Sequence, residues 1–598
     1  MLRVLPALMT YAMFFSSHRL VKALEILAVL AIAWAFTRPK WGSAGFTWIE
    51  RQFRALAAHR VRAILVAGAI PMAVRLVMLA WYPPPQPIVH DEFSYLLQAD
   101  TFAHGRLANQ TPPYWQHFET EYTLLRPTYA SQYEPAQGLI LAFGQVVFGH
   151  PWWGVWLSVG VMCGAFCWAL GTVLPMGWAL FGALLAALQF GIFGIWMNSY
   201  FGGAVSATAG AFIFGALVSL HKTKGWRRMA VLCAAGLAML FATRPFEGLI
   251  WSCIVLIYGY VILRKQRVSG ALLWRELLLP FVAVCCLGGL GLAYYNWRVT
   301  GNATIPPYLT YRAIYGTPQP FWWQGPITIP HFTYPELRDN YLNQRRLYER
   351  RNSLGAMLMA ERERLRDFWR FFIGPFLTPA LLFVALLFRD RKIRPWLFIS
   401  LAFIADKATY HAWFPAQNGP ATILILLIVV QCWRHLRAWQ RRHQFGMAMS
   451  RTLMAGLCLT IVIGGLGRAA EPMLGPSFRH IVPIWESLYP PQRLRDDISA
   501  KLDQIPGKHL VFVKYATGHC FCEEWVFNLA NPSEQKIVYI RPDKPATDIG
   551  IAEAFSDFDV WLMEPDQHPY RLSRLTTWDE IANIRGDEEQ EANKIAKK

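Results

Sequence analysis

Two adjacent carboxylates follow an apolar run near the start of the chain. His90, Asp91 and Glu92 stand together directly after a stretch that ends in AWYPPPQP. An unpaired charge at the edge of a membrane costs free energy, so such a pair needs either partners or a function. A carboxylate partly screened from water can act as a general base on a hydroxyl group. Alternatively, the carboxylates cap the helix that follows, because acidic groups favour a helix N-terminus.

Three cations lie within or beside other apolar runs. Arg75 is inside the first core span, Lys407 is inside a later span, and Arg244 opens the break TRPFEG. Together they could bind a phosphate, because guanidinium groups match phosphate oxygens. The structural alternatives are that Arg75 pairs with the acidic pair, that Lys407 pairs with Asp406 or reaches the surface, and that Arg244 is an ordinary loop residue.

Further polar side chains stand where Pro and Gly interrupt the apolar runs. Such residues can be helix-start carboxylates and polar turns, but the Gly202-Gly203 pair also allows a ligand to approach the backbone closely. We expect these residues to line the same substrate site: His90, Tyr95, Glu134, Asn198, Tyr200, Glu247, His411, Gln417 and Asn418.

One polar segment near the end of the chain contains metal-ligand residue types. GHCFCEE offers His519, Cys520, Cys522 and Glu523, but their spacing matches no common zinc pattern. A disulfide or a plain loop suits this segment better. We therefore predict no metal site and no cofactor, although the acidic pair would admit a divalent cation.

The composition is typical of a membrane protein. Of 598 residues, 54% are hydrophobic and only 16% are charged, whereas soluble proteins carry about 25% charged residues. Runs of about 20 apolar residues predict roughly 11 to 13 membrane-spanning helices. The net charge of +19 comes from Lys and Arg in short loops between apolar runs, as the positive-inside rule expects. We expect no nucleic-acid partner.

The basic loops also predict which motifs share a side of the membrane. Residues 221–228, 264–267, 389–394 and 434–443 are basic and should be cytoplasmic. All four loops lie on one side of the membrane if successive spans alternate in direction and the short apolar run Gly138–Phe148 lies at the interface and does not cross the membrane. The polar, Pro- and Gly-broken motifs then gather on the opposite face, where we expect the site.

The end of the chain is predicted to form a soluble domain. The runs HLVFVKY, KIVYIRP and DVWLMEP are short and β-rich, with helix-like stretches between or before them. The predicted fold class is an α-helical polytopic membrane protein with a small soluble C-terminal α/β domain. We predict an N-terminal membrane hairpin and basic segment (1–61), a catalytic membrane domain (62–468) with external loops 83–137 and 300–370, and the C-terminal domain (469–598).

These residues resemble a known family. The stretch HDEFSYLLQADTFAHGRLANQTPP, the long loop after the first core span, the helix restart YEP and about a dozen spans are similar to the C-type (GT-C) membrane glycosyltransferases. The protein O-mannosyltransferase and aminoarabinose transferase group is the nearest by pattern, over roughly residues 63–467. The resemblance implies a polyprenyl-phosphate sugar donor and a catalytic acid in the first external loop, which is Asp91 with Glu92 beside it. The chain departs from the family pattern at Asn198, where a second acid is common, and at Glu134-Pro135, where Pro-Pro or Lys-Pro-Pro is usual.

The predicted function is therefore sugar transfer with inversion of configuration, with Asp91 as general base and Arg244, Arg75 or Lys407 at the donor phosphate. The acceptor would be an envelope glycan, a lipid or a protein. The expected location is a bacterial inner membrane with the active face in the periplasm. A transporter or flippase of a lipid-linked or anionic substrate is the alternative, since it explains cations within spans and broken helices. A polymerase or ligase of the same superfamily is not separated from the first reading.

Overall fold

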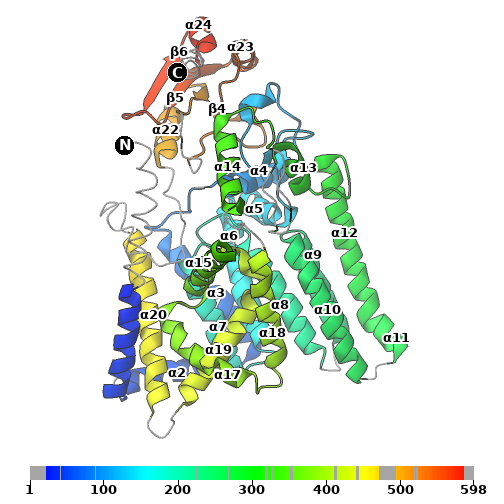
Figure 1. Ribbon diagram of the computed structural model, residues 1–598, viewed down its shortest axis with the longest axis vertical. Coiled ribbons are helices and arrows are strands. Elements are labelled where there is room, and N and C mark those ends of the chain that lie inside the picture. Colours follow the sequence, from blue (N-terminus) through cyan, green and yellow to red (C-terminus); the bar gives the residue numbers. More distant parts are fainter. Residues whose placement is uncertain are drawn as a thin grey trace.

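The computed structural model describes residues 22–584 apart from gaps at 41, 88, 222–224, 267–268, 317–320, 322–323, 325–328, 350–353, 410–413, 440–443, 470–492, 517–518 and 520–522. A helical bundle carries a small sheet domain at one end (Figure 1). The predicted fold class, a polytopic helical membrane protein with a C-terminal α/β domain, is confirmed.

Six helical segments of the described chain are long and apolar enough to cross a membrane, and a seventh does so if one pair bent by 82° is counted. They comprise or include α3 (Arg60–Met78), α6 (Trp152–Leu170), α10 (Pro245–Gln266), α12 (Leu279–Thr300), α19 (Thr422–Ala438) and α20 (Phe445–Ala469). Four shorter apolar helices accompany them. The count is lower than the 11 to 13 expected, in part because these four helices have only 10–17 residues, as in the continuous segment of α7 (Met176–Ala186) and the π-helix η2 (Ala187–Ile192).

Small residues let the central helices pack closely. Helix α8 (Gly203–Ser219) is buried along almost its whole length, between α6 and α9 (Trp226–Phe241). A Cβ atom at Gly210 would lie 2.2 Å from the carbonyl oxygen of Pro420. Such close backbone approach is typical of helix association in membranes. Helix α8 therefore gives firm support to the 196–203 turn that precedes it.

Two helices that pack on each other border the region that carries the polar motifs. Helix α4 (His90–Ala103) begins with two acids, which favour a helix N-terminus, and is followed by Gly105 in the left-handed region (φ 70°). Helix α5 (Pro135–Phe148) begins at a proline, as the restart motif predicts. It has 14 residues, too few to cross a membrane, in agreement with the expected interfacial helix.

The segment between α4 and α5 covers this end of the bundle. It contains η1 (Trp115–Phe118) and a short hairpin of β1 (Thr123–Leu124) and β2 (Ala130–Ser131). Helices α13 (Pro307–Tyr315) and α14 (Pro335–Glu349), from the second predicted external loop, lie at the same end (Figure 1). The two predicted external loops therefore meet.

The C-terminal domain contains a four-stranded sheet in the order β4-β3-β5-β6. Strands β3 (Lys508–Val513), β4 (Ile537–Ile540) and β5 (Phe558–Glu564) are parallel and match the three β-rich runs, whereas β6 (Arg571–Leu575) is antiparallel and was not expected. The domain also contains α22 (Arg493–Asp503), α23 (Pro545–Ala554) and α24 (Trp578–Ala582). The predicted boundary at 468/469 falls at the end of α20, and the domain limits stay a prediction.

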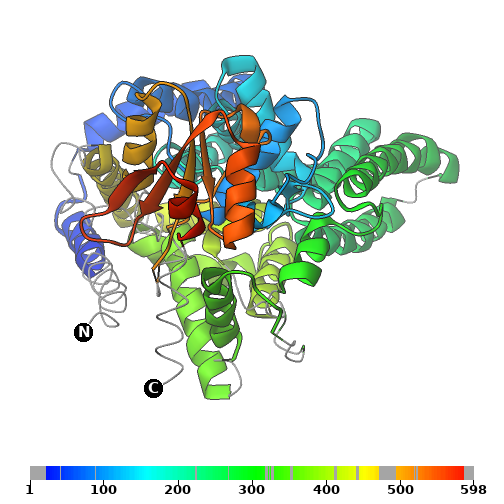
Figure 2. The same ribbon diagram turned by 90° about the horizontal axis from the view of Figure 1, so that it is seen from above.

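The sheet packs directly on the first loop. Side chains alternate along β3, so that Leu510 and Phe512 face one side and Val511 and Val513 the other. The first side shares a hydrophobic cluster with Leu97 of α4 and with residues of the covering segment, and the second side packs against α22. Figure 2 shows the sheet lying over the middle of the bundle end.

Candidate active site

Asp91 stands at the start of α4 and accepts a short hydrogen bond from the Tyr133 hydroxyl. Burial raises the pKa of the Asp91 carboxyl, although the Tyr133 hydrogen bond and the neighbouring His90 and Arg244 side chains act in the opposite direction. A carboxylate more basic than a free Asp accepts a proton more readily. The geometry therefore suits Asp91 as a proton acceptor.

Glu92, the second of the two predicted catalytic residues, has a different environment. One of its carboxylate oxygens accepts the backbone N–H of Val89 at 3.3 Å, and the other accepts that of Tyr200 at 3.0 Å. Its side chain is buried. These are the hydrogen bonds of a helix cap, extended to the turn before α8. The capping alternative thus describes Glu92, and Asp91 is the carboxylate left for chemistry.

Arg75 is fully buried and its guanidinium is occupied by the protein. It donates from Nη1 to the Tyr82 carbonyl at 2.7 Å, from Nη2 to the Pro83 carbonyl at 2.9 Å, and from Nε to Asn198 Oδ1 at 3.2 Å. It also lies over the rings of Tyr82 and Trp152. The expected pair with Asp91 or Glu92 is absent from the described contacts. Arg75 fixes the chain where it leaves α3, and its donors face the protein and not a phosphate.

Arg244 differs from Arg75 in its burial and in its hydrogen bonds. It is half-buried directly before α10 and forms no side-chain hydrogen bond or ion pair with any other described residue. Burial raises the pKa of Tyr95, and the charge of Arg244 opposes that rise, as it does for Asp91. The guanidinium therefore lies close enough to both residues to act on them electrostatically.

Glu134, the residue before α5, is a second unusual carboxyl. Its Oε2 atom is buried and has no hydrogen-bond partner in the described part of the chain. Burial raises the pKa of Glu134 from its usual 4.5 to about 7. Its charge acts on Tyr95 and Tyr295, so it lies beside the same group. A carboxyl group with such a pKa can give or take a proton at neutral pH.

These residues form one group, which we call the acid–cation cluster: Asp91, Tyr95, Tyr133, Glu134 and Arg244. Tyr95 lies one helical turn after Asp91, so both side chains leave α4 on the same side. The Tyr95 and Tyr133 rings stack with their centroids 4.4 Å apart. The cluster joins α4, the start of α5 and the start of α10. The sequence analysis did not single out Tyr133, although the segment YEPAQG contains it.

Several predicted site residues instead hold the backbone around the cluster. Asn198 accepts from Arg75 and donates to the Ile192 and Gly194 carbonyls, and the Tyr200 hydroxyl donates to the Pro85 carbonyl at 2.9 Å. The polar-turn alternative describes both. Glu247 is buried in the first turn of α10. His411 and the side chain of Lys407 lie outside the described residues.

His90 faces away from the cluster. Its ring nitrogens lie 3.8 Å from Glu524 and 4.0 Å from Glu121. Glu524 belongs to the C-terminal domain, so His90 contacts that domain while its neighbour Asp91 contacts the bundle side.

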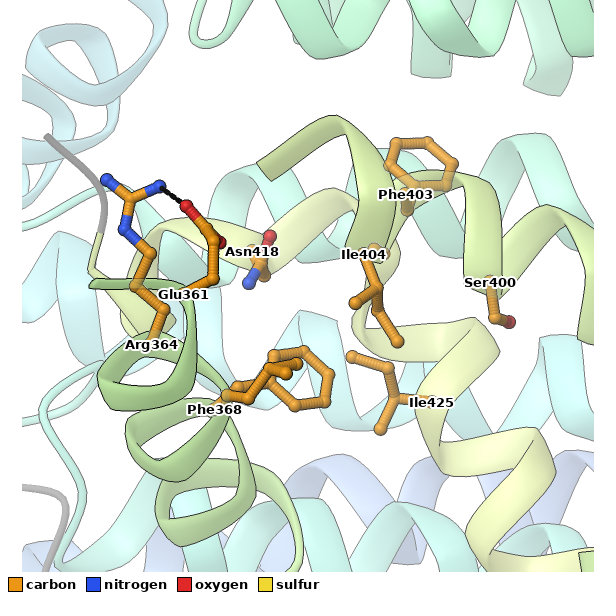
Figure 3. Close-up of a pocket in the computed structure, with 10 residues that line it drawn as sticks. Glu361, Arg364, Phe368, Ser400, Phe403, Ile404, Asn418 and Ile425 are labelled. Atoms are coloured by element: carbon orange, nitrogen blue, oxygen red, sulfur yellow. Dashed lines mark hydrogen bonds and ion pairs between the residues drawn. The ribbon is translucent and has the colours of Figure 1, made fainter. Parts of the chain in front are cut away.

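Gln417 and Asn418 were expected to line one site with Asp91, and that expectation stays a prediction. Both belong to η5 (Pro415–Ala421), where Asn418 lines a cavity of about 30 Å³ to which no residue of the acid–cation cluster contributes. Figure 3 shows the Glu361–Arg364 ion pair on one side of this cavity and Phe403, Ile404 and Ile425 on the other. These residues belong to α15 (Leu354–Phe372), α18 (Arg394–Thr409) and α19. The cavity has a charged side and an apolar side, and its volume admits only one or two water molecules.

The described residues contain no group of three or more His, Cys, Asp or Glu side chains arranged to hold a metal ion. Cys520 and Cys522 lie outside the described residues. Asp91 and Glu92 accept hydrogen bonds from different partners, a tyrosine hydroxyl and two backbone amides respectively.

Neither a family model nor a curated protein matches this chain. Solved structures do. ArnT from Cupriavidus metallidurans bound to undecaprenyl phosphate matches at a TM-score of 0.45 and 13% identity, over 84% of this chain and 92% of that chain. The oligosaccharyltransferase AglB from Archaeoglobus fulgidus, in complex with an inhibitory peptide and a dolichol-phosphate, matches at 0.43 and 10%, over 84% and 69%. At these values the roles of individual residues are argued from the site alone.

Proposed function

We propose that this chain is a membrane glycosyltransferase that transfers a sugar from a polyprenyl-phosphate donor to an acceptor, with Asp91 as general base. One observation carries the proposal. A carboxylate of raised pKa and an arginine without a described hydrogen-bond partner lie together at the end of an apolar bundle. A sugar linked to a membrane lipid through phosphate would place its reacting bond at that level.

The reaction would exchange one bond at the anomeric carbon for another. An acceptor hydroxyl or amine attacks that carbon while its proton passes to the Asp91 carboxylate. The bond from the anomeric carbon to the phosphate oxygen breaks on the opposite face, which inverts the configuration. Arg244 would stabilise the charge that grows on the leaving phosphate, which is usually a large electrostatic contribution to catalysis. Lys407 is proposed as a second cation there.

The other polar residues of the cluster would orient the substrates. Tyr133 holds the Asp91 carboxylate through its hydroxyl, and the stack with Tyr95 restricts the Tyr133 ring. Glu134 would contact a sugar or acceptor hydroxyl through its unpartnered oxygen. The charge bias of the loops favours a site on the non-cytoplasmic face, and our proposal takes that face to be the periplasmic side of a bacterial inner membrane.

Two variants of the purified chain test the proposal. Asp91→Asn should abolish sugar transfer but keep the donor bound, whereas Arg244→Ala should lose the donor. The measurement is mass spectrometry of the lipids that co-purify with each variant. Enrichment of a polyprenyl-phosphate sugar on Asp91→Asn over Arg244→Ala supports the proposal and names the sugar. Wild-type turnover by Asp91→Asn contradicts it, and movement of an intact lipid-linked sugar across liposomes without transfer favours the transporter alternative.

A further inference from the structure

Helix α4 separates two environments. Asp91, Tyr95 and Gln98 point to the bundle side, where they contact Tyr133, and Gln98 also donates to the Tyr295 hydroxyl. These positions are three or four residues apart and therefore share one face of the helix.

The opposite face of α4 contacts the C-terminal domain along its whole length. Phe93 stacks on Phe527 with centroids 4.6 Å apart, and the Asp100 carboxylate accepts the backbone N–H of Ala530 at 2.9 Å. His90 is the first residue of this face, 3.8 Å from Glu524. The C-terminal domain therefore contacts the same helix that carries Asp91, one residue away from it.

Arg541 organises the end of this interface that is nearest Asp91. It is almost fully buried, and its Nη2 donates to Glu524 Oε2 at 2.6 Å while its Nε donates to the Glu119 carbonyl at 2.8 Å. Its Nη1 lies 3.4 Å from Glu336 of α14. One side chain thus joins the C-terminal domain, the first loop and the second loop.

Glu524 lies between this arginine and His90, with its Oε2 atom 2.6 Å from Arg541 and 3.8 Å from His90 Nδ1, the latter beyond hydrogen-bond distance. Tyr515 donates to its Oε1 at 2.7 Å, and the backbone N–H of Val526 donates to the same atom at 2.8 Å. Burial raises the pKa of Glu524, but Arg541, with His90, outweighs burial and keeps the net pKa below its usual value. Glu524 is therefore a fixed carboxylate, held by neighbours on its own domain, that faces the His90 ring.

We propose that Glu524 is a positioning residue supplied by the C-terminal domain, which fixes His90, and through it the first turn of α4, so that Asp91 is directed at the reacting atoms. This inference rests on the proposed transfer reaction. It makes the C-terminal domain a part of the active site and not an appended module. Glu524 itself would touch neither donor nor acceptor.

The test compares Glu524→Gln with Asp548→Asn in the full-length protein. Asp548 pairs with His117 at 2.8 Å across the same interface and is equally buried, but this pair does not contact the first turn of α4. Both variants replace one buried carboxylate by an amide of similar size. A merely structural role would predict similar losses in both.

We expect Glu524→Gln to lower kcat by about tenfold to a hundredfold with the donor KM nearly unchanged, because misplacement by about 1 Å costs that much. Asp548→Asn should keep kcat near wild type. His90→Gln should lower kcat as well, and adding it to Glu524→Gln should lower kcat little further, because both act through one contact. A wild-type kcat in Glu524→Gln, or equal losses in both carboxylate variants, would overturn the proposal.

A second measurement separates this proposal from the proposed function. Tyr133 replaced by 3-fluorotyrosine gives a ¹⁹F resonance that reports on its hydrogen bond to Asp91 and needs no turnover. Glu524→Gln should shift that resonance and Asp548→Asn should not. If the wild type transfers no sugar but the shift is seen, the transfer function fails and the positioning role stands. If the wild type transfers sugar and no shift is seen, the positioning role fails alone.

Discussion

The arginines on the two sides of α4 differ in how many hydrogen-bond acceptors surround them. On the side of the C-terminal domain, Arg541 is buried and each nitrogen of its guanidinium has an acceptor within 3.4 Å. On the bundle side, Arg244 has no such partner among the described residues, and Glu134 keeps one buried oxygen unpaired. A buried guanidinium with an acceptor at every nitrogen stabilises a fold, whereas a guanidinium without such acceptors at the end of a bundle is a candidate for binding a substrate.

The largest expected effect is on the stability of the interface between α4 and the C-terminal domain. Arg541→Met leaves Glu524 buried without its cation, and breaking a buried pair in this way costs about 3–5 kcal/mol. We expect the C-terminal domain to detach more readily, which limited proteolysis of the purified protein would measure as faster release of a C-terminal fragment. Unchanged proteolysis would mean that the network is not what joins the domain to the loops.

Removing Arg244, the cation on the bundle side, should instead lower activity and leave stability nearly unchanged. Arg244→Ala should reduce sugar transfer by about a hundredfold to a thousandfold, the usual cost of deleting one group that stabilises transition-state charge. The midpoint of thermal unfolding should stay within about 2 °C of wild type, since surface or unpaired side chains contribute little to stability. A large fall in that midpoint would show that Arg244 has a structural partner and would remove the contrast with Arg541.

A smaller effect should come from Glu134 and should depend on pH. Its pKa in the folded chain is about 7, raised from 4.5, so the folded state favours the protonated carboxyl. Stability contributed by this group is therefore lost as the pH rises from about 4.5 to about 7, and stays lost above that. Glu134→Gln removes this dependence. Relative to wild type, the variant should be more stable at pH 8 than at pH 5, as thermal unfolding at the two pH values would show; an equal difference would contradict the raised pKa.

The sequence identified the parts of the site that violate a general rule. Asp91 and Arg244 were found because a charge at the edge of an apolar run is costly and needs a reason. The three buried strands were found because β-branched and apolar residues dominate them. In contrast, β6 reads RLSRL and has mostly exposed or half-exposed positions, so its charged residues concealed an edge strand.

What the sequence did not show depends on contacts between distant residues. Arg75 was expected at a phosphate, but it donates to the backbone carbonyl groups of Tyr82 and Pro83. Every residue has a backbone carbonyl group, so nothing in the sequence indicated these partners. Glu92 and Asp91 are indistinguishable by type and position, and only the approach of the Tyr200 amide separates them. Arg541 and Glu524 lie more than 400 positions from His90, so no local spacing connects them.

The same separation has a consequence for biosynthesis. Residues 90–100 of α4 emerge from the ribosome long before residues 524–541, which complete their surroundings. Chains grow from the N-terminus, and contacts so far apart form late. On our proposal the carboxylate that removes the proton is aligned only after the last domain has folded onto the first loop. A nascent or truncated chain that lacks residues 524–541 would therefore occupy the membrane but transfer lipid-linked sugar slowly, and full activity would begin once these residues have folded onto the first loop.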